Sequence, residues 1–261
     1  MNQPKRPSFP ARLGPLTSAP AAGRPVRTGM QAKPAAAAMY APSGVGLDSA
    51  AVRTRMVQRL AASGITSAAV LQAMGAVERH MFVDTALVNQ AYEDTSLPIG
   101  LAQTISKPSV VARMTELLLG AEGARAGLGR VLEIGTGCGY QAAVLGRVAK
   151  EVYSIERLRG LHEKARNNLR PLRLTNVHLL FGDGMLGYAQ GAPYAGIIAA
   201  AGGDAVPAAW CEQLAVGGRL VAPMARSNGQ QILLVIDKTP YGFQESVLEA
   251  VNFVPLKSGI A

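Results

Sequence analysis

The segment that most constrains the fold is residues 131–140, which read Val-Leu-Glu-Ile-Gly-Thr-Gly-Cys-Gly-Tyr. The first four residues predict a buried strand, and glycine then occupies every second position before a helical stretch begins. Because glycine has no Cβ, the backbone of such a turn can approach a ligand closely, and the N-terminus of the following helix can face it. This order predicts a ligand site at the carboxyl end of a strand in an α/β fold.

Short runs rich in β-forming residues recur through the second half of the chain, separated by segments that can hold helices. The alternation predicts an α/β, Rossmann-like fold with a mostly parallel seven-stranded sheet and helices on both faces. No helix fits between the last two runs, so they predict a C-terminal antiparallel hairpin at one edge. The expected strands are 130–134, 151–155, 177–181, 195–200, 219–222, 232–236 and 246–253.

Helical periodicity precedes the sheet and predicts an N-terminal helical preface. Apolar residues between Val52 and Leu60 recur at helical spacing, and a second helix is expected over 67–77. Ser106 then precedes Pro108 and an apolar stripe. That pattern is typical of a serine N-cap followed by an amphipathic helix.

Residues 1–47 differ in composition from the rest of the chain. They hold eight of the 16 prolines and six basic residues, but no acidic residue. Such a segment buries too little apolar surface to offset the entropy lost on ordering, so we predict a disordered basic tail followed by one folded domain over 48–261. An organellar transit peptide is the alternative explanation for this composition.

Charge and cysteine content point to an ordinary globular protein. Residues 48–261 keep 20 basic against 17 acidic residues, so the net charge of +9 says little about the folded part. The two cysteines match neither a disulfide framework nor a metal-ligand spacing. No apolar stretch reaches the roughly 18 to 20 residues that cross a bilayer. The sequence therefore predicts a cytoplasmic protein without a metal site.

The spacing of the glycines distinguishes two classes of nucleotide site. A nicotinamide-binding fingerprint needs Gly-x-Gly-x-x-Gly, but Tyr140 stands where the third glycine belongs. Gly-x-Gly-x-Gly with Glu133 two positions earlier resembles the first motif of S-adenosylmethionine-dependent methyltransferases. Glu156 ends the next strand, where it could accept bonds from ribose hydroxyls, and Asp183-Gly184 could receive an adenine. Singly, each is more simply a solvated charge or a turn; their order favours a cofactor site.

From about residue 50 to its last residue, the chain resembles the protein L-isoaspartyl (D-aspartyl) O-methyltransferases. Five segments carry the similarity in the family's order: 91–106, 135–143, 182–184, 214–220 and 253–256. The resemblance implies S-adenosylmethionine as cofactor. The tail has no counterpart in it.

The resemblance also assigns roles to single positions. It implies that Ser106 is the catalytic residue and contacts the substrate; helix capping is the ordinary alternative, and the two roles are compatible. The family continues with Ala-Pro-His where this chain has Lys107-Pro108-Ser109, so rate or substrate preference is expected to differ. The expected substrate-binding residues are Ser106, Val254, Pro255 and Leu256, and the expected cofactor-binding residues are Ile105, Glu133, Gly135, Thr136, Gly137, Gly139, Glu156, Asp183, Gly184 and Gln231.

The reaction implied is methyl transfer to the free α-carboxylate of an L-isoaspartyl residue, and by the family's pattern of a D-aspartyl residue, in a damaged protein. The ester then closes to a succinimide, which begins repair. A carboxylate is already ionised at pH 7, so the reaction needs no general base and no metal. The expected partners are isoaspartyl proteins and peptides, without a stable nucleic-acid or membrane partner, and the enzyme is expected to be a monomer.

Three alternatives stay open at this point. A nucleic acid or small molecule could be the methyl acceptor, although the Asn-Pro-Pro-Tyr type of loop of DNA amino-methyltransferases is replaced here by residues 199–203. The altered residues 107–109 would also suit a scaffold that binds cofactor without catalysis. The basic tail could dock to nucleic acid or a membrane, and such binding would weaken with salt.

Overall fold

The computed structural model describes residues 50–226 and 228–261, so the predicted tail lies outside the described residues. Within this described part, no helix combines the length and the apolar character needed to cross a bilayer. The helices are α1 (Ala50–Ala62), α2 (Ala68–Ala76), α3 (Pro108–Leu119), α4 (Tyr140–Leu145), α5 (Arg159–Leu169) and α6 (Ala208–Gln213), with 3₁₀ turns η1 (Arg79–Phe82), η2 (Thr85–Gln90), η3 (Glu122–Ala124), η4 (Arg170–Leu172), η5 (Gly184–Leu186) and η6 (Ala189–Gly191). The strands are β1 (Leu97–Gly100), β2 (Gln103–Ile105), β3 (Leu128–Ile134), β4 (Ala149–Glu156), β5 (Val177–Phe181), β6 (Tyr194–Ala199), β7 (Leu214–Ala225), β8 (Gln231–Thr239) and β9 (Gly242–Val251).

The main sheet has seven strands in the order β5-β4-β3-β6-β7-β8-β9. Strands β3 to β7 pair in parallel, whereas β8 and β9 add to the edge as an antiparallel hairpin. This confirms the predicted mostly parallel sheet and its edge hairpin. The chain order reverses at β3, which has β4 on one side and β6 on the other, and ligands of open α/β sheets bind at such a switch point. The separate hairpin β1–β2 was not expected from the sequence.

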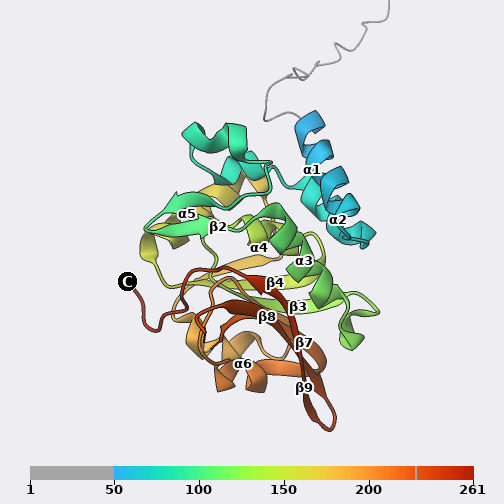
Figure 1. Ribbon diagram of the computed structural model, residues 1–261. Coiled ribbons are helices and arrows are strands. Elements are labelled where there is room, and N and C mark those ends of the chain that lie inside the picture. Colours follow the sequence, from blue (N-terminus) through green and yellow to red (C-terminus); the bar gives the residue numbers. More distant parts are fainter. Residues whose placement is uncertain (1–49, 227) are drawn as a thin grey trace, which may run out of the picture. The chain divides into compact units, whose positions relative to one another are not determined.

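Helices cover both faces of the sheet, and neighbouring residues of β3 point to opposite faces. Val131 packs in a core with Met114 and Leu118 of α3. Leu132 belongs to another core that contains Trp210 of α6. Figure 1 shows α6 across the sheet from α1, α2 and α3. The predicted placement of helices on both faces is therefore confirmed.

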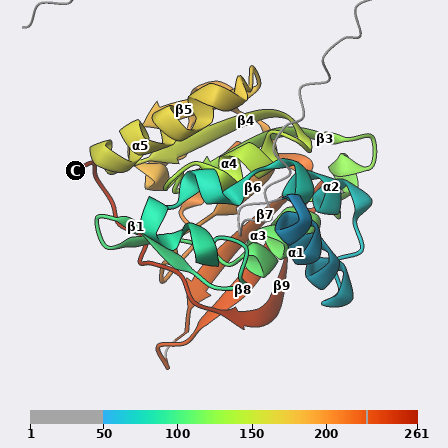
Figure 2. The same cartoon turned by 90° about the horizontal axis from the view of Figure 1, so that it is seen from above.

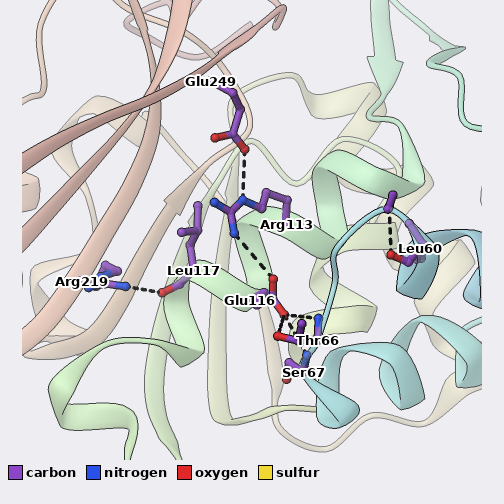
Figure 3. A network of polar contacts seen from close by, with 9 residues as sticks. Leu60, Thr66, Ser67, Arg113, Glu116, Leu117, Arg219 and Glu249 are labelled. Carbon is purple, nitrogen blue, oxygen red and sulfur yellow. Dashed lines mark hydrogen bonds and ion pairs between the residues drawn. The ribbon is translucent and has the colours of Figure 1, made fainter.

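Helix α3 is held by charged side chains on two sides, as Figure 3 shows. The Glu116 carboxylate accepts a hydrogen bond of 2.7 Å from the backbone N–H of Thr66, in the link between α1 and α2. Arg113 donates to Glu249 of β9 over 3.1 Å. These contacts connect the helical preface, α3 and the sheet edge. They fix the position of the segment before α3, which carries Ser106.

The predicted N-cap role of Ser106 is wrong. Lys107 occupies the cap position, and its side chain makes no capping bond. Asp94, which lies before β1, serves instead: its carboxylate accepts bonds of 2.8 Å from both the backbone N–H and the hydroxyl of Ser109. Pro108 has no N–H to offer, so the first free donors of the helix reach a carboxylate from another segment. The hydroxyl of Ser106 therefore has no capping duty.

Candidate functional site

A cavity of about 260 Å³ lies at the carboxyl ends of β3 and β4. Its wall combines the glycine turn after β3, the hairpin β1–β2, the turn after β4 and residues 254–257. The fold thus brings together segments that are far apart in the chain. Ten of the predicted site residues line it: Ile105, Ser106, Gly135, Thr136, Gly137, Glu156, Gly184, Val254, Pro255 and Leu256.

The glycine turn adopts backbone conformations that favour glycine. Gly135 and Gly137 have φ angles of 91° and 58°, in the left-handed region. A Cβ on Gly137 would also lie 3.2 Å from a methyl group of Ile99 in the hairpin β1–β2. A side chain here would be strained and crowded. The turn therefore leaves its backbone open to a ligand in the cavity.

Glu156 connects the glycine turn to the cavity. One of its carboxylate oxygens accepts a bond of 2.8 Å from Gly137 N–H, and the other accepts one of 2.9 Å from Leu158 N–H. The side chain lines the cavity although the residue is only 5% exposed. A carboxylate offers about four acceptor sites, so two remain for a ligand. Glu156 can fix the turn and still accept bonds from two neighbouring hydroxyls.

Glu133 lies behind the cavity and does not line it. Its fully buried carboxylate accepts a short hydrogen bond from the Ser154 hydroxyl, whose oxygen is 2.6 Å from that of Thr136. Either hydroxyl can donate in the contact between Thr136 and Ser154, because a protonated Glu133 can also donate to Ser154. The second Glu133 oxygen and the Gln141 side-chain nitrogen make no hydrogen bond of ordinary geometry within the described residues, although Gln141 is close enough to act against the rise in the pKa of Glu133. Thr136 and Gln141 both line the cavity, so this network can respond to a ligand there.

Burial raises the pKa of Glu133 from its ordinary 4.5 to about 8. The folded state therefore holds a proton that the unfolded chain releases between these values, so this contribution to stability is complete below pH 4.5 and is lost as the pH rises toward 8. We expect Glu133→Gln to remove a slope of at most about 1.4 kcal/mol per pH unit in the free energy of unfolding. Urea unfolding without ligand at pH 5, 6.5 and 8 measures it. Glu163→Gln, on the exposed side of α5, should keep the parent's slope, and parallel profiles for parent and Glu133→Gln would contradict the prediction.

Gln231 holds the wall of the cavity from outside. Its side-chain oxygen accepts a bond of 2.6 Å from Phe253 N–H, and its nitrogen donates over 3.1 Å to Phe253 C=O. Gly202 continues this support, donating to Val254 C=O over 2.8 Å and accepting from Leu256 N–H over 2.7 Å. Both polar atoms of Gln231 are thus engaged in positioning the segment that begins at Phe253.

Asp183 also does not line the cavity, although its neighbour Gly184 does. One carboxylate oxygen accepts from Met185 N–H over 2.9 Å, and the other accepts from Gly259 N–H over 2.6 Å. The Trp210 indole, in α6, donates to Gly184 C=O over 2.8 Å and holds the same loop. Gly139, the fourth predicted residue outside the lining, is the N-cap residue that precedes α4 and has a φ of 91°.

A second cavity, of about 330 Å³, adjoins the first and shares Ser106 with it. Residues 250–254 form one of its sides. Within the described residues, the Ser106 hydroxyl makes no hydrogen bond, and Lys107 is the one charged residue that lines this cavity. Lys107 is exposed. Ser106 therefore stands between two spaces, one with nucleoside-binding features and one beside an extended backbone segment.

Sequence reasoning missed several lining residues. Tyr140 and Gln141 come immediately after Gly139, and their place in the first turn of α4 could have indicated them. Leu101 and Ala102, at the tip of the hairpin β1–β2, line the cavity with φ angles of 51° and 56°. Left-handed turns usually contain glycine or asparagine, so leucine and alanine at these positions did not indicate a turn. Arg157 and Leu158 line it as well and carried no motif.

The residues around the first cavity fit the predicted cofactor. The turn at Gly137 gives a close approach, and Glu156 presents acceptor sites that suit a ribose diol. Thr136 and Gln141 add polar side chains to the lining. A nucleoside with a ribose diol would match these features, and S-adenosylmethionine contains one.

Comparisons with known proteins agree with this geometry. The model of the family protein-L-isoaspartate(D-aspartate) O-methyltransferase matches residues 51–261. The protein-L-isoaspartate O-methyltransferase of Methylibium petroleiphilum is 58% identical over 263 residues, covering 97% of this chain and 96% of the relative. The enzyme of the same name from Leptothrix cholodnii is 59% identical over 219 residues, covering 83% and 77%.

Solved structures share the fold. A protein-L-isoaspartate O-methyltransferase structure aligns with a TM-score of 0.71 at 29% identity, covering 80% of this chain and 67% of the other. A Plasmodium falciparum structure in complex with S-adenosyl-L-homocysteine shares the fold with a TM-score of 0.67 at 22% identity, covering 78% and 98%. With the family model spanning residues 51–261, this chain belongs to the protein-L-isoaspartate(D-aspartate) O-methyltransferase family.

Proposed function

We propose that this protein transfers a methyl group from S-adenosylmethionine to the free α-carboxylate of L-isoaspartyl, and also D-aspartyl, residues in damaged proteins, and so begins repair through a succinimide. The observation that carries the proposal is the position of Ser106 between the two cavities. One cavity has the features of a nucleoside site, and the other runs along an extended segment that can face a peptide. Family membership supports the same reaction.

When bound, S-adenosylmethionine supplies an activated methyl group on a sulfonium. The chain's own residues provide the positions: Glu156 accepts bonds from the ribose hydroxyls, and the Ser106 hydroxyl donates to the acceptor carboxylate. That carboxylate is ionised at pH 7, so no residue has to act as a base. Holding two reactants in line can lower the activation barrier by on the order of 7 to 11 kcal/mol. The wall at residues 254–256 would exclude water from the reacting groups. Water exclusion helps because the positive charge of the sulfonium and the negative charge of the carboxylate disappear together as the methyl group moves.

The test is transfer of labelled methyl to matched peptides that differ only in one residue: L-isoaspartate, D-aspartate or normal L-aspartate. We expect a base-labile ester on the L-isoaspartyl peptide, a weaker signal on the D-aspartyl peptide and none on the L-aspartyl peptide. If the protein binds S-adenosyl-L-homocysteine but labels none of them, a catalytically silent scaffold or another acceptor replaces this proposal. Labelling of nucleic acid under the same conditions would identify such an acceptor.

Lys107 is expected to favour substrates with an acidic side chain beside the isoaspartate, because its exposed ammonium has no ion-pair partner within the described residues. For peptides with Glu or Gln at that flanking position, we predict kcat/KM higher by about two- to fivefold for Glu, the usual effect of an exposed ion pair. Lys107→Ala should remove the preference, Lys107→Arg should keep it, and 0.5 M salt should weaken it. Lys150→Ala, an equal loss of charge at another exposed position, should leave it intact. An unchanged preference in Lys107→Ala would count against this role.

We further propose that the enzyme works as a monomer in the cytoplasm, without a stable nucleic-acid or membrane partner. In support of a reducing compartment, both cysteines are free thiols. Light scattering at micromolar concentration tests the oligomeric state. A measured mass equal to two chains would show that the protein is a dimer and overturn the proposed monomer.

A further inference from the structure

Arg79, the first residue of η1, is a cation buried in the core of the protein. Its exposed fraction is 0%, and it forms no ion pair within the described residues. A buried charge without an opposite charge is costly, so its other contacts must offset the loss of water. Those contacts therefore show what this side chain holds in place.

The guanidinium of Arg79 holds the backbone of residues 91–96, here called the link segment because it connects η2 with β1. Its Nε donates to Ala91 C=O over 2.8 Å, and a terminal nitrogen donates to Thr95 C=O over 3.4 Å. Within the described residues, no other side chain donates to these two carbonyl groups. The position of the link segment therefore depends on Arg79.

The same guanidinium also contacts a residue of the first cavity. Its central carbon lies 4.8 Å from the centre of the Tyr140 ring, in a cation–π contact. Phe82 packs on this ring with 5.5 Å between the ring centres, and the Tyr140 hydroxyl donates to the Met74 sulfur over 3.7 Å. These two contacts would remain without Arg79. Loss of Arg79 is thus expected to affect the link segment more than the Tyr140 ring.

The link segment is joined to the chain on both sides of Ser106. Leu97, which follows the link segment, pairs with Ile105 of β2, the residue directly before Ser106. Asp94 accepts bonds of 2.8 Å from the backbone N–H and the hydroxyl of Ser109, three positions after Ser106. Figure 2 shows the chain between α2 and β1 beside α3 and α4. The position of the Ser106 hydroxyl therefore depends on where the link segment lies.

We propose that Arg79 is a positioning residue for the substrate side of the site: it holds the link segment so that the Ser106 hydroxyl reaches the acceptor carboxylate. Arg79 lines neither cavity and acts through the backbone. Ser96, the last residue of the link segment, lines the second cavity, so the same contacts also shape that space. The inference rests on the role of Ser106 in the proposed function. It adds a residue that lies outside all five segments of the family resemblance.

The test compares two quantities in Arg79→Met: kcat/KM for the L-isoaspartyl peptide at saturating S-adenosylmethionine, and the affinity for S-adenosyl-L-homocysteine. Methionine donates no hydrogen bond, so the two carbonyl groups lose their donor. We expect kcat/KM to fall by at least about tenfold, because a misplacement of about 1 Å can cost on the order of 100-fold in rate. The affinity for S-adenosyl-L-homocysteine should stay near the parent's value. Arg79→Lys keeps a cationic donor and should recover part of the lost kcat/KM.

Val70→Ala is the matched control for a loss of stability. Val70 is 0% exposed, belongs to the same apolar core as Phe82 and Tyr140, and lines neither cavity. Urea unfolding should show that Val70→Ala and Arg79→Met are both less stable than the parent, but only Arg79→Met should lose kcat/KM. Equal losses of kcat/KM in these two folded variants would show a merely structural role. A matching loss of affinity for S-adenosyl-L-homocysteine in Arg79→Met would place its effect at the first cavity, and either result overturns the proposal.

If neither Arg79 variant folds, Asp94→Ala tests the same connection from the surface. Asp94 is exposed, and its loss removes both bonds from the link segment to Ser109. Its kcat/KM should fall while the affinity for S-adenosyl-L-homocysteine is kept, and a kcat/KM equal to the parent's rejects the proposal. A parent that labels no isoaspartyl peptide would remove the proposed function together with this inference. An active parent and a folded, equally active Arg79→Met would remove the inference alone.

Discussion

Replacing Glu156 with alanine is expected to lower the affinity for S-adenosyl-L-homocysteine by at least about 100-fold, because two bonds from ribose hydroxyls to a carboxylate would be lost. The variant also leaves Gly137 N–H and Leu158 N–H without their acceptor, so the glycine turn loses its fixed position. Both effects act on the same cavity. Isothermal titration with S-adenosyl-L-homocysteine measures the change directly and needs no peptide.

Two further variants separate ligand binding from folding. Glu156→Gln keeps the side-chain shape and one acceptor oxygen, so its affinity should fall between those of the parent and Glu156→Ala. Glu163→Ala removes the same charge from the exposed face of α5, outside the cavity lining, and should bind as the parent does. If folded Glu156→Ala binds with the parent's affinity, the ribose assignment fails.

Ser106→Ala is expected to lower kcat/KM for the L-isoaspartyl peptide by about 10- to 100-fold while cofactor affinity stays nearly constant. A hydrogen bond to a charged group is worth about 1.5 to 3 kcal/mol, which corresponds to this range of rates. The hydroxyl makes no bond within the described residues, so its removal leaves no protein group unpaired there. Steady-state methyl transfer and titration with S-adenosyl-L-homocysteine measure the two quantities on the same preparation.

Ser109→Ala is the matched control for Ser106→Ala. Ser109 lies three positions further along the chain, and its hydroxyl donates to Asp94 and lines neither cavity. Its loss should leave methyl transfer close to the parent's value, because Ser109 N–H still donates to Asp94. A large loss of cofactor affinity in Ser106→Ala would instead show that Ser106 maintains the shape of the first cavity.

The sequence alone predicted the sheet because the information for it is local. Alternation of β-rich runs with helical segments predicted all seven strands of the main sheet, including the antiparallel edge hairpin. The glycine spacing predicted where the chain must turn, and the positive φ angles at Gly135 and Gly137 agree with it. The order of Glu156 and Gly184 along the chain predicted a common site, and both residues line one cavity.

The tertiary structure decided which atoms are free and which are engaged. Asp94 binds the first turn of α3 at Ser109, 15 positions away, and so leaves the Ser106 hydroxyl without a capping bond. Gln231 supports the wall at Phe253 across 22 positions. Asp183 is bound by Gly259 across 76 positions. Sequence patterns report periodicity and spacing within a segment, whereas these partners depend on the strand order, which brings distant loops to one edge of the sheet.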